Sequence, residues 1–172
     1  MGTIYKIYLL LGSNKSFSFI DDGVLRSLTP RRIVLKAKQR IGEDFEIVAH
    51  SSILKTKPVG SFEGEYGGKI SDFYNQILVI KTSLKPLKVL ELCQQIEIEF
   101  GRDRDLELLK RGEDKRVERL YSSRSLDIDI LKVYQIVCNQ PKEITIDTPR
   151  LQVPHIQIET RPFVKTLLAE LE

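Results

Sequence analysis

Two aspartates, Asp127 and Asp129, are the residues of this sequence best suited to chemistry, because they alternate with apolar residues in a strand-like run. A period of two puts Leu126, Ile128 and Ile130 on one face and both aspartates on the other. Same-face residues lie roughly 6–7 Å apart along a strand, so the two carboxylates repel each other unless a cation lies between them. Mg²⁺ prefers such hard oxygen ligands. The pattern predicts a magnesium site, and the alternative is a half-exposed strand with two ordinary solvated aspartates.

Arginines near this pair would suit a polyanionic substrate. Arg124 lies three residues before Asp127, and its planar guanidinium can hold a phosphate through two hydrogen bonds. Arg102 and Arg104 begin a stretch dense in charge, and Arg150 lies further along the chain. For each of them the alternative is a solvated surface ion pair. Phosphoryl chemistry needs positioning and charge neutralisation more than covalent help from the protein, so no general base is required.

Four separated motifs give the sequence a family resemblance. In order and content they resemble the 6-hydroxymethyl-7,8-dihydropterin pyrophosphokinase family, over almost the whole chain from Tyr8 to about Leu168. The resemblance implies transfer of pyrophosphate from ATP to a pterin alcohol, which leaves AMP, in folate biosynthesis. The motifs are Gly12–Asn14, Gln94–Arg104, the aspartate pair, and Leu151–His155 followed by Arg161–Phe163.

The same resemblance implies roles for individual residues. Asp127 and Asp129 would hold two Mg²⁺ ions that bridge the triphosphate. The expected catalytic residues are Arg102, Arg104, Arg124 and the two aspartates. The expected ATP-binding residues are Gln94, Glu97, Arg124, Ile130, Arg150, His155 and Arg161. A lone histidine is more often structural, but His155 stands in a Val-Pro-His motif, whereas His50 stands in none.

A pterin is a flat heteroaromatic ring, so its site needs aromatic faces and a few fixed hydrogen bonds. By resemblance, the ring lies between two phenylalanines, two polar side chains read its edge, and one valine contributes through its backbone. An isolated phenylalanine is far more often a core residue, so the prediction depends on the set as a whole. The expected pterin-binding residues are Thr56, Val59, Phe73, Asn75 and Phe163.

Some positions depart from the family pattern. Leu120 and Ser122 stand where the family usually has a basic and a small residue, and Arg119 is displaced by one position. Ile156 follows His155 where an aromatic hydroxyl is common. These changes leave open a catalytically weakened, nucleotide-binding member of the family. An RNA-binding module would need exposed strand aromatics and a basic face, and a sugar-nucleotide transferase with an Asp-x-Asp motif would need a longer chain.

Hydrophobic periodicity predicts alternating strands and helices that would position these residues. The expected helices begin at Pro30 and Pro86, because proline suits the first helical position, and end near Gly42 and Gly101. A third helix is expected over Arg161–Leu171. The expected strands are Ile4–Leu11, Phe45–Leu54, Phe73–Lys81, the aspartate strand, Val133–Cys138 as a hairpin-like continuation, and Ile144–Ile146.

The glycines and polar residues of Thr56–Ser71 predict a mobile loop. Arg102–Ser123, which is dense in charge and nearly free of apolar periodicity, is either disordered or a lid over the site, and the arginines at both of its ends favour the lid. The prediction is an α+β fold with a mostly antiparallel sheet flanked by helices and long mobile catalytic loops. The family resemblance implies a ferredoxin-like core.

Composition agrees with this hypothesis. A chain of 172 residues with 41% apolar content suits one domain, which we expect to span residues 1–172. The net charge of +3 is mild and both signs are interspersed, so no nucleic-acid partner is expected. The two cysteines form no CxxC pair, and no signal peptide or membrane span is evident. We therefore expect a cytoplasmic monomer whose partners are ATP and a pterin alcohol, with no membrane.

Overall fold

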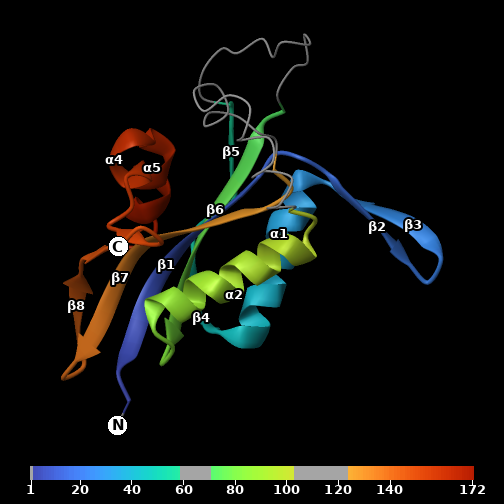
Figure 1. Ribbon diagram of the computed structural model, residues 1–172. Helices are drawn as coiled ribbons and strands as arrows, with labels where there is room; N and C mark the ends of the chain where they lie inside the picture. Colours follow the sequence, from blue (N-terminus) through green and yellow to red (C-terminus); the bar gives the residue numbers. More distant parts are fainter. Residues whose placement is uncertain (1, 59–70, 103–123) are drawn as a thin grey trace.

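The computed structural model describes residues 2–58, 71–102 and 124–172, and an antiparallel sheet lies at its centre (Figure 1). The strands lie in the order β4, β6, β1, β7, β8, and β5 pairs with the beginning of β6. The succession β1, α1, β4, β6, α2, β7 with this order is that of a ferredoxin-like core, so the predicted fold class is confirmed. The strands are Ile4–Ser13 (β1), Glu46–His50 (β4), Leu54–Thr56 (β5), Phe73–Thr82 (β6), Asp127–Val137 (β7) and Gln140–Ile144 (β8).

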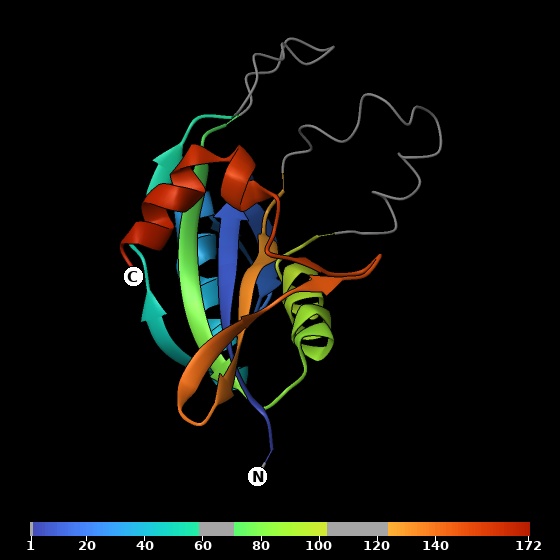
Figure 2. The same cartoon turned by 90° about the vertical axis from the view of Figure 1, so that its left-hand side faces the viewer.

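Helices cover both faces of the sheet (Figure 2). The central strand β1 has apolar side chains on both faces: Leu9 and Leu11 point to one cluster, and Tyr8 and Leu10 point to the other. Burial on both faces explains why this strand is apolar without alternation. The first cluster packs under α1 and α2, and the second under α4 and α5. These helices are Pro30–Asp44 (α1), Pro86–Glu99 (α2), Gln157–Thr160 (α4) and Pro162–Ala169 (α5).

Three element boundaries differ from the prediction. The expected strand Phe45–Leu54 is divided into β4 and β5, because the buried hydroxyl of Ser51 accepts the backbone N–H of Ile77 at 2.9 Å and interrupts the ladder. The expected separate strand Val133–Cys138 is the continuation of β7, which turns into β8 through Asn139 at positive φ. The short helix α4 and the two-residue strands β9 (Ile146–Asp147) and β10 (Gln152–Val153) were not predicted in this form.

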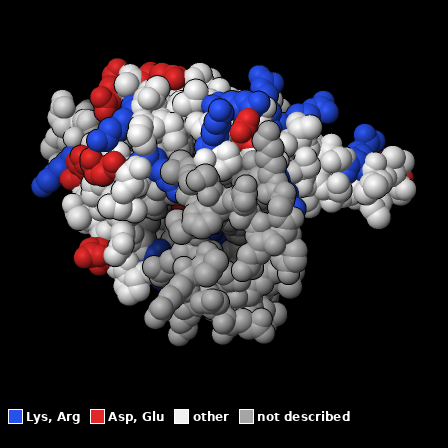
Figure 3. Space-filling model, turned by 90° about the horizontal axis from the view of Figure 1, so that it is seen from above, with Lys and Arg blue, Asp and Glu red and all other residues white. Residues whose placement is uncertain are grey.

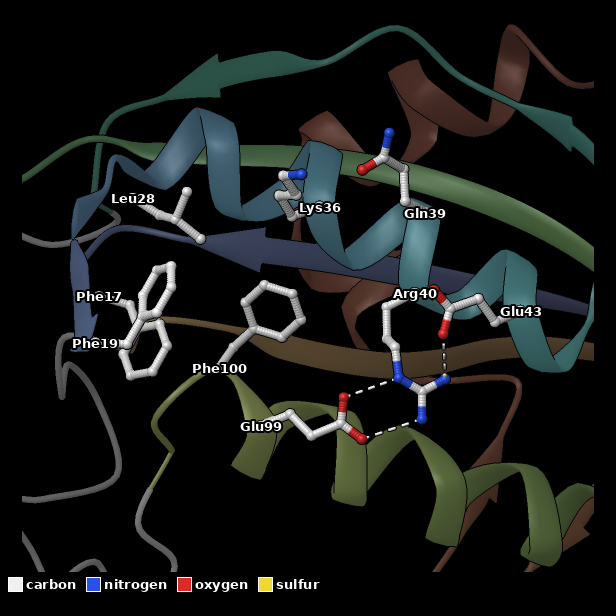
Figure 4. A pocket seen from close by; sticks show the side chains of 9 residues that line it. All are labelled: Phe17, Phe19, Leu28, Lys36, Gln39, Arg40, Glu43, Glu99 and Phe100. Carbon is white, nitrogen blue, oxygen red and sulfur yellow. Dashed lines mark hydrogen bonds and ion pairs between the residues drawn. The ribbon is translucent and has the colours of Figure 1, made fainter. Parts of the chain in front are cut away.

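A hairpin that the sequence did not reveal stands apart from the main sheet. Among the described residues, its strands, β2 (Phe17–Asp21) and β3 (Val24–Leu28), pair only with each other, and they project from the body of the molecule (Figures 1 and 3). The base of the hairpin borders a cavity of about 470 Å³ together with α1 and α2. Figure 4 shows the rings of Phe17 and Phe19, which are stacked with centroids 5.7 Å apart, and that of Phe100 beside this cavity.

The greater part of both predicted loops lies outside the described residues, and so do Val59, Arg104, Arg119, Leu120 and Ser122. Within the described residues, no helix is long and apolar enough to cross a membrane.

Candidate active site

Asp127 and Asp129 lie on one face of β7, as the alternation predicts. Ile128 and Ile130 point the other way, into the core under α1 and α2, and each is at most 3% exposed. The aspartate side chains retain 25% and 27% exposure, so their oxygens are accessible to a ligand. The apolar residues thus fix the strand by burial and aim both carboxylates at the opposite face.

Two arginines converge on Asp127. Arg102 Nη1 donates to Asp127 Oδ1 at 2.7 Å, and Arg124 Nη1 donates to Asp127 Oδ2 at 2.9 Å. Arg102 directly follows the end of α2: its backbone N–H donates to the carbonyl of Glu97, and Gly101 before it has a φ of 87°. Such a helix end requires glycine. The structure therefore brings together the arginines predicted on either side of residues 103–123.

Glu97 lies beneath the aspartate strand. The residue is 1% exposed, and its Oε1 accepts the backbone N–H of Ile128 at 2.8 Å and Arg102 Nη1 at 2.7 Å. Its carboxylate therefore fixes β7 at the residue between the two aspartates and holds one of the two arginines. The structure therefore places Glu97, for which the family resemblance implied an ATP contact, at the base of the site that holds Asp127 and Arg102.

The pKa of Asp129 is raised far above that of an ordinary aspartate. Burial, followed by repulsion from Asp127 and Glu97, raises its pKa to about 8, although Gln157 and Arg124 favour the ionised form. Gln157 Nε2 donates to Asp129 Oδ2 at 3.0 Å. A carboxylate that is difficult to ionise because of negative neighbours is a favourable place for a cation. Two aspartates with hard oxygen ligands thus fit Mg²⁺, which also takes water and substrate phosphates as ligands.

Among the described residues, no group of three or more histidine, cysteine, aspartate or glutamate side chains is arranged to hold a metal ion. Zinc sites usually have three or four such protein ligands, whereas Mg²⁺ is commonly bound through one or two carboxylates together with water and substrate phosphates. Asp127 and Asp129 therefore remain the candidate protein ligands for Mg²⁺ among the described residues.

His155 stands beside Asp129 in its neutral form. Its backbone N–H donates to the carbonyl of Leu131 at 2.9 Å, and Leu131 is the bulged residue of β7 that has no partner in β1. The ring Nδ1 accepts the N–H of Gln157 at 3.2 Å, so the proton lies on Nε2, 4.0 Å from Asp129 Oδ1. Burial lowers the pKa of His155. The imidazole can therefore donate a hydrogen bond towards an anionic oxygen at this site.

Sequence reasoning missed Gln157. Its backbone sets the tautomer of His155, and its side chain holds Asp129. Its position two residues after the Val-Pro-His motif was the only local signal.

A pocket of about 290 Å³ adjoins Asp129 and His155. It also contains Ile130 and Arg150, two of the residues predicted to bind ATP, and its mixture of apolar and polar walls suits a nucleotide. Arg150 donates to Glu91 at 3.2 Å at the rim of α2. Gln94, on α2, and Arg161, between α4 and α5, are both half-buried, and neither lines this pocket.

The predicted pterin residues gather around the start of β6. Asn75 is 4% exposed, and its Nδ2 donates to Thr56 Oγ1 at 2.9 Å and to the carbonyl of Leu54 at 3.4 Å. Phe73 is directly opposite Thr56 in the pairing of β5 with β6. Phe163 begins α5 and packs against the cluster on the same face of the sheet. The structure therefore places Thr56, Phe73 and Asn75 together, with Phe163 on the same face of the sheet.

Gly12 connects the two halves of the site. It pairs with Asn75 on β6 and with Asp127 on β7, so these three residues form one row across the sheet with their side chains on one face. With strands about 4.8 Å apart, the backbones of Asn75 and Asp127 are separated by roughly 10 Å. Glycine contributes no side chain to the floor between them. A planar molecule held at Asn75 can thus extend towards Asp127.

The site combines paired carboxylates, arginines and a polar pocket on a ferredoxin-like sheet. This combination is typical of metal-dependent enzymes that act on phosphate groups.

Comparison with known proteins gives the family. The family model of 7,8-dihydro-6-hydroxymethylpterin-pyrophosphokinase matches residues 8–172. The chain is 31% identical to the 2-amino-4-hydroxy-6-hydroxymethyldihydropteridine pyrophosphokinase of Pseudomonas aeruginosa, over 98% of this chain and 81% of that protein. It is 30% identical to the enzymes of the same name from Haemophilus influenzae (95% and 79%) and Porphyromonas gingivalis (96% and 89%). The chain belongs to this family, and the predicted class of enzyme, a pyrophosphokinase, is confirmed.

Proposed function

We propose that Asp127 and Asp129 hold two Mg²⁺ ions for the reaction that this chain catalyses, the transfer of pyrophosphate from ATP to the hydroxymethyl group of 6-hydroxymethyl-7,8-dihydropterin. ATP and Mg²⁺ belong to the reaction of the whole family, and the number of ions is the proposed part. One observation supports the assignment: Asn75, Gly12 and Asp127 form one row of the sheet, so a residue proposed to bind the pterin and a carboxylate proposed to bind Mg²⁺ lie on the same face.

The nucleotide would occupy the pocket beside Asp129. Its walls place a neutral histidine with a proton on Nε2 next to the carboxylates, where that proton can be donated to a phosphate oxygen. Arg102 and Arg124 would neutralise the charge of the triphosphate, together with Arg104, which lies outside the described residues. Further proposed ATP-binding residues are Gln94, Glu97, Ile130, Arg150, His155 and Arg161.

The pterin would lie at the other end of the row. Thr56 and Asn75 present a hydroxyl and an amide to its polar edge, and Phe73 and Phe163 would cover its two faces. Val59, which lies outside the described residues, completes the proposed set. The hydroxymethyl group would then point across Gly12 towards the aspartates, close to the β-phosphate of ATP, in the arrangement that an in-line displacement requires.

Arg102 and Arg124 are both paired with Asp127: their guanidinium groups donate to its carboxylate. Asp127 would hold Mg²⁺, which supplies positive charge to the triphosphate, and the phosphate oxygens would compete with the carboxylate for the same guanidinium groups. The arginines would then exchange a carboxylate for phosphate without leaving the site.

The assignment is tested by measuring AMP formation and metal binding together. We expect Asp127→Asn and Asp129→Asn each to abolish turnover and to weaken the binding of Mn²⁺, used as a spectroscopic substitute for Mg²⁺, in the presence of ATP. Asp147→Asn, an exposed aspartate on β9, is the control that should change neither. Near wild-type turnover by either site variant at saturating Mg²⁺ would contradict the metal assignment.

We further propose one domain over residues 1–172, a monomer, and a cytoplasmic location. Light scattering of the purified protein checks the monomer, since a dimer would scatter as twice 19.8 kDa.

A further inference from the structure

Asn14, the last residue of the Gly12–Asn14 motif, has no part in the site described so far. It directly follows β1 and is only 3% exposed. A buried amide needs hydrogen-bond partners, because an unpaired polar group in the interior is costly. Its partners therefore indicate why an asparagine is buried here.

The partner of Asn14 is the backbone of Arg124. The N–H of Asn14 donates to the Arg124 carbonyl at 3.2 Å, and Asn14 Oδ1 accepts the Arg124 N–H at 2.8 Å. The regular pairing of β1 with β7 ends at Gly12 and Asp127. Beyond that point, one asparagine satisfies both backbone groups of the arginine, where the ladder no longer does.

The side chain of Arg124 depends on this attachment. Its guanidinium donates to Asp127 at 2.9 Å, only three residues along the chain. Fixing the backbone of Arg124 therefore limits where the guanidinium can lie relative to the carboxylates. We propose that Asn14 is a positioning residue for pyrophosphoryl transfer and acts through Arg124. This inference rests on the phosphate-binding role proposed for Arg124.

The other atoms around Asn14 show which of its groups is needed. Asn14 Nδ2 is buried and has no hydrogen-bond partner among the described residues, and the same is true of Ser13 Oγ. The acceptor oxygen of Asn14 is thus the part of the side chain that is used. Aspartate keeps this oxygen in nearly the same place, alanine removes it, and Ser13→Ala removes a neighbouring polar atom that bonds to no described residue.

The first test compares the steady-state rates of these variants. We expect Asn14→Ala to lower kcat for AMP formation by about one to two orders of magnitude, the range for a misplaced catalytic group, with the KM for the pterin within about twofold. Asn14→Asp should recover most of kcat, and Ser13→Ala should leave it unchanged. Equal losses in Asn14→Ala and Asn14→Asp, or a pterin KM that changes more than kcat, would overturn the proposal.

The second test is a double-mutant cycle. Arg124→Ala keeps the backbone groups that Asn14 binds but removes the guanidinium, so Asn14→Ala should lower kcat no further in this background. Amide hydrogen exchange should show faster exchange at residue 124 in Asn14→Ala than in Ser13→Ala. If the losses of kcat in Asn14→Ala and Arg124→Ala multiplied in the double variant, the proposal for Asn14 would be overturned, while the role proposed for Arg124 would stand. If Arg124→Ala itself retained full kcat, the role of Arg124 would fail, and the proposal for Asn14 with it.

Discussion

At the scale of single residues, Asp127 and Asp129 occupy equivalent positions on one face of β7, yet their surroundings differ in charge. Asp127 accepts hydrogen bonds from two arginines, whereas Asp129 is held by the neutral amide of Gln157. Two arginines therefore face three carboxylates once Glu97 is included. Burial of Asp129, followed by repulsion from the carboxylates of Asp127 and Glu97, raises the pKa of Asp129.

This difference in charge predicts that Asp129→Asn and Asp127→Asn change the melting temperature in opposite directions. The pKa of Asp129 in the folded protein, about 8, is far above its ordinary value of about 4. Between these two pH values the folded protein keeps a proton that the unfolded chain loses, so the free energy of unfolding falls as the pH rises from about 4 to about 8. We expect Asp129→Asn to raise the melting temperature of the metal-free protein at pH 8, by about 2–4 °C per kcal/mol of repulsion removed, and to change it little near pH 4.

Asp127→Asn provides the contrast. It removes a charged acceptor from Arg102, whose side chain is only 9% exposed, so the melting temperature should fall. Scanning calorimetry from pH 4 to pH 8, with and without Mg²⁺, checks both variants. A parallel pH dependence in wild type and Asp129→Asn would contradict the account given for Asp129.

Gly12 allows a second test at this scale. A Cβ at this position would lie 3.4 Å from Asn75 Oδ1, which is ordinary contact, so Gly12→Ala should fold normally. Its methyl group would nevertheless stand on the floor between the places proposed for the two substrates. We expect kcat/KM for the pterin to fall by about tenfold or more, measured as AMP formation. Gly42→Ala in α1, whose Cβ would meet Ile47 at 3.5 Å, should keep full activity.

At the scale of elements, the hairpin β2–β3 supports the end of α2. The ring of Phe17 lies against Gly101, and any Cβ at position 101 would overlap that ring. Arg102 follows immediately and is bonded to both Glu97 and Asp127. The hairpin projects from the main sheet (Figure 1), yet its residue Phe17 packs against Gly101, which directly precedes Arg102.

Two glycine substitutions separate this contact from backbone strain. Gly101 and Gly23 both have positive φ, at 87° and 75°, but nothing lies within 4 Å of a Cβ at Gly23. Gly23→Ala should therefore cost only the strain of that conformation, about 1–2 kcal/mol, with normal activity. Gly101→Ala should destabilise more and lower kcat as well, because Phe17 and Arg102 must move. Denaturant unfolding and AMP assays check both; equal effects of the two would contradict the supporting role of the hairpin.

At the scale of the whole molecule, the two faces of the sheet differ, and one of them carries the candidate site residues. One face packs on α1 and α2, and the other carries Asp127, Asp129, Gly12 and Asn75 below α4 and α5. The two substrates would then lie side by side over one face, at opposite ends of one row. The binding affinity of each substrate should therefore depend mainly on the residues at its own end of the row.

A crossed pattern of affinities is expected from this layout. Phe163→Ala removes one apolar face of the pterin site and should weaken pterin binding by about 1–3 kcal/mol, with little change in ATP affinity. Arg124→Ala should lower the maximal rate and ATP affinity more than pterin affinity. Titration calorimetry of each ligand with both variants measures the four changes. Loss of ATP binding alone in Phe163→Ala would exchange the places of the two substrates.

The sequence by itself determined those features that depend on neighbouring residues. The alternation around Asp127 and Asp129 established a strand with both carboxylates on one face, and Pro30 and Pro86 marked the starts of two helices. Such patterns are local, because burial of one face repeats with the period of the element itself. The four family motifs gave the expected fold and family, which the strand order and the comparisons confirmed.

Only the tertiary structure decided which of these residues meet. The bonds that build the site join residues 25 positions apart for Arg102 and Asp127, 28 for Gln157 and Asp129, and 110 for Asn14 and Arg124. No local periodicity encodes such pairings, since they depend on strand register, on the bulge at Leu131 and on the helix end at Gly101. For the same reason the burial of Glu97 under β7, the position of Gly12 between Asn75 and Asp127 and the raised pKa of Asp129 became visible only when the strands were assembled.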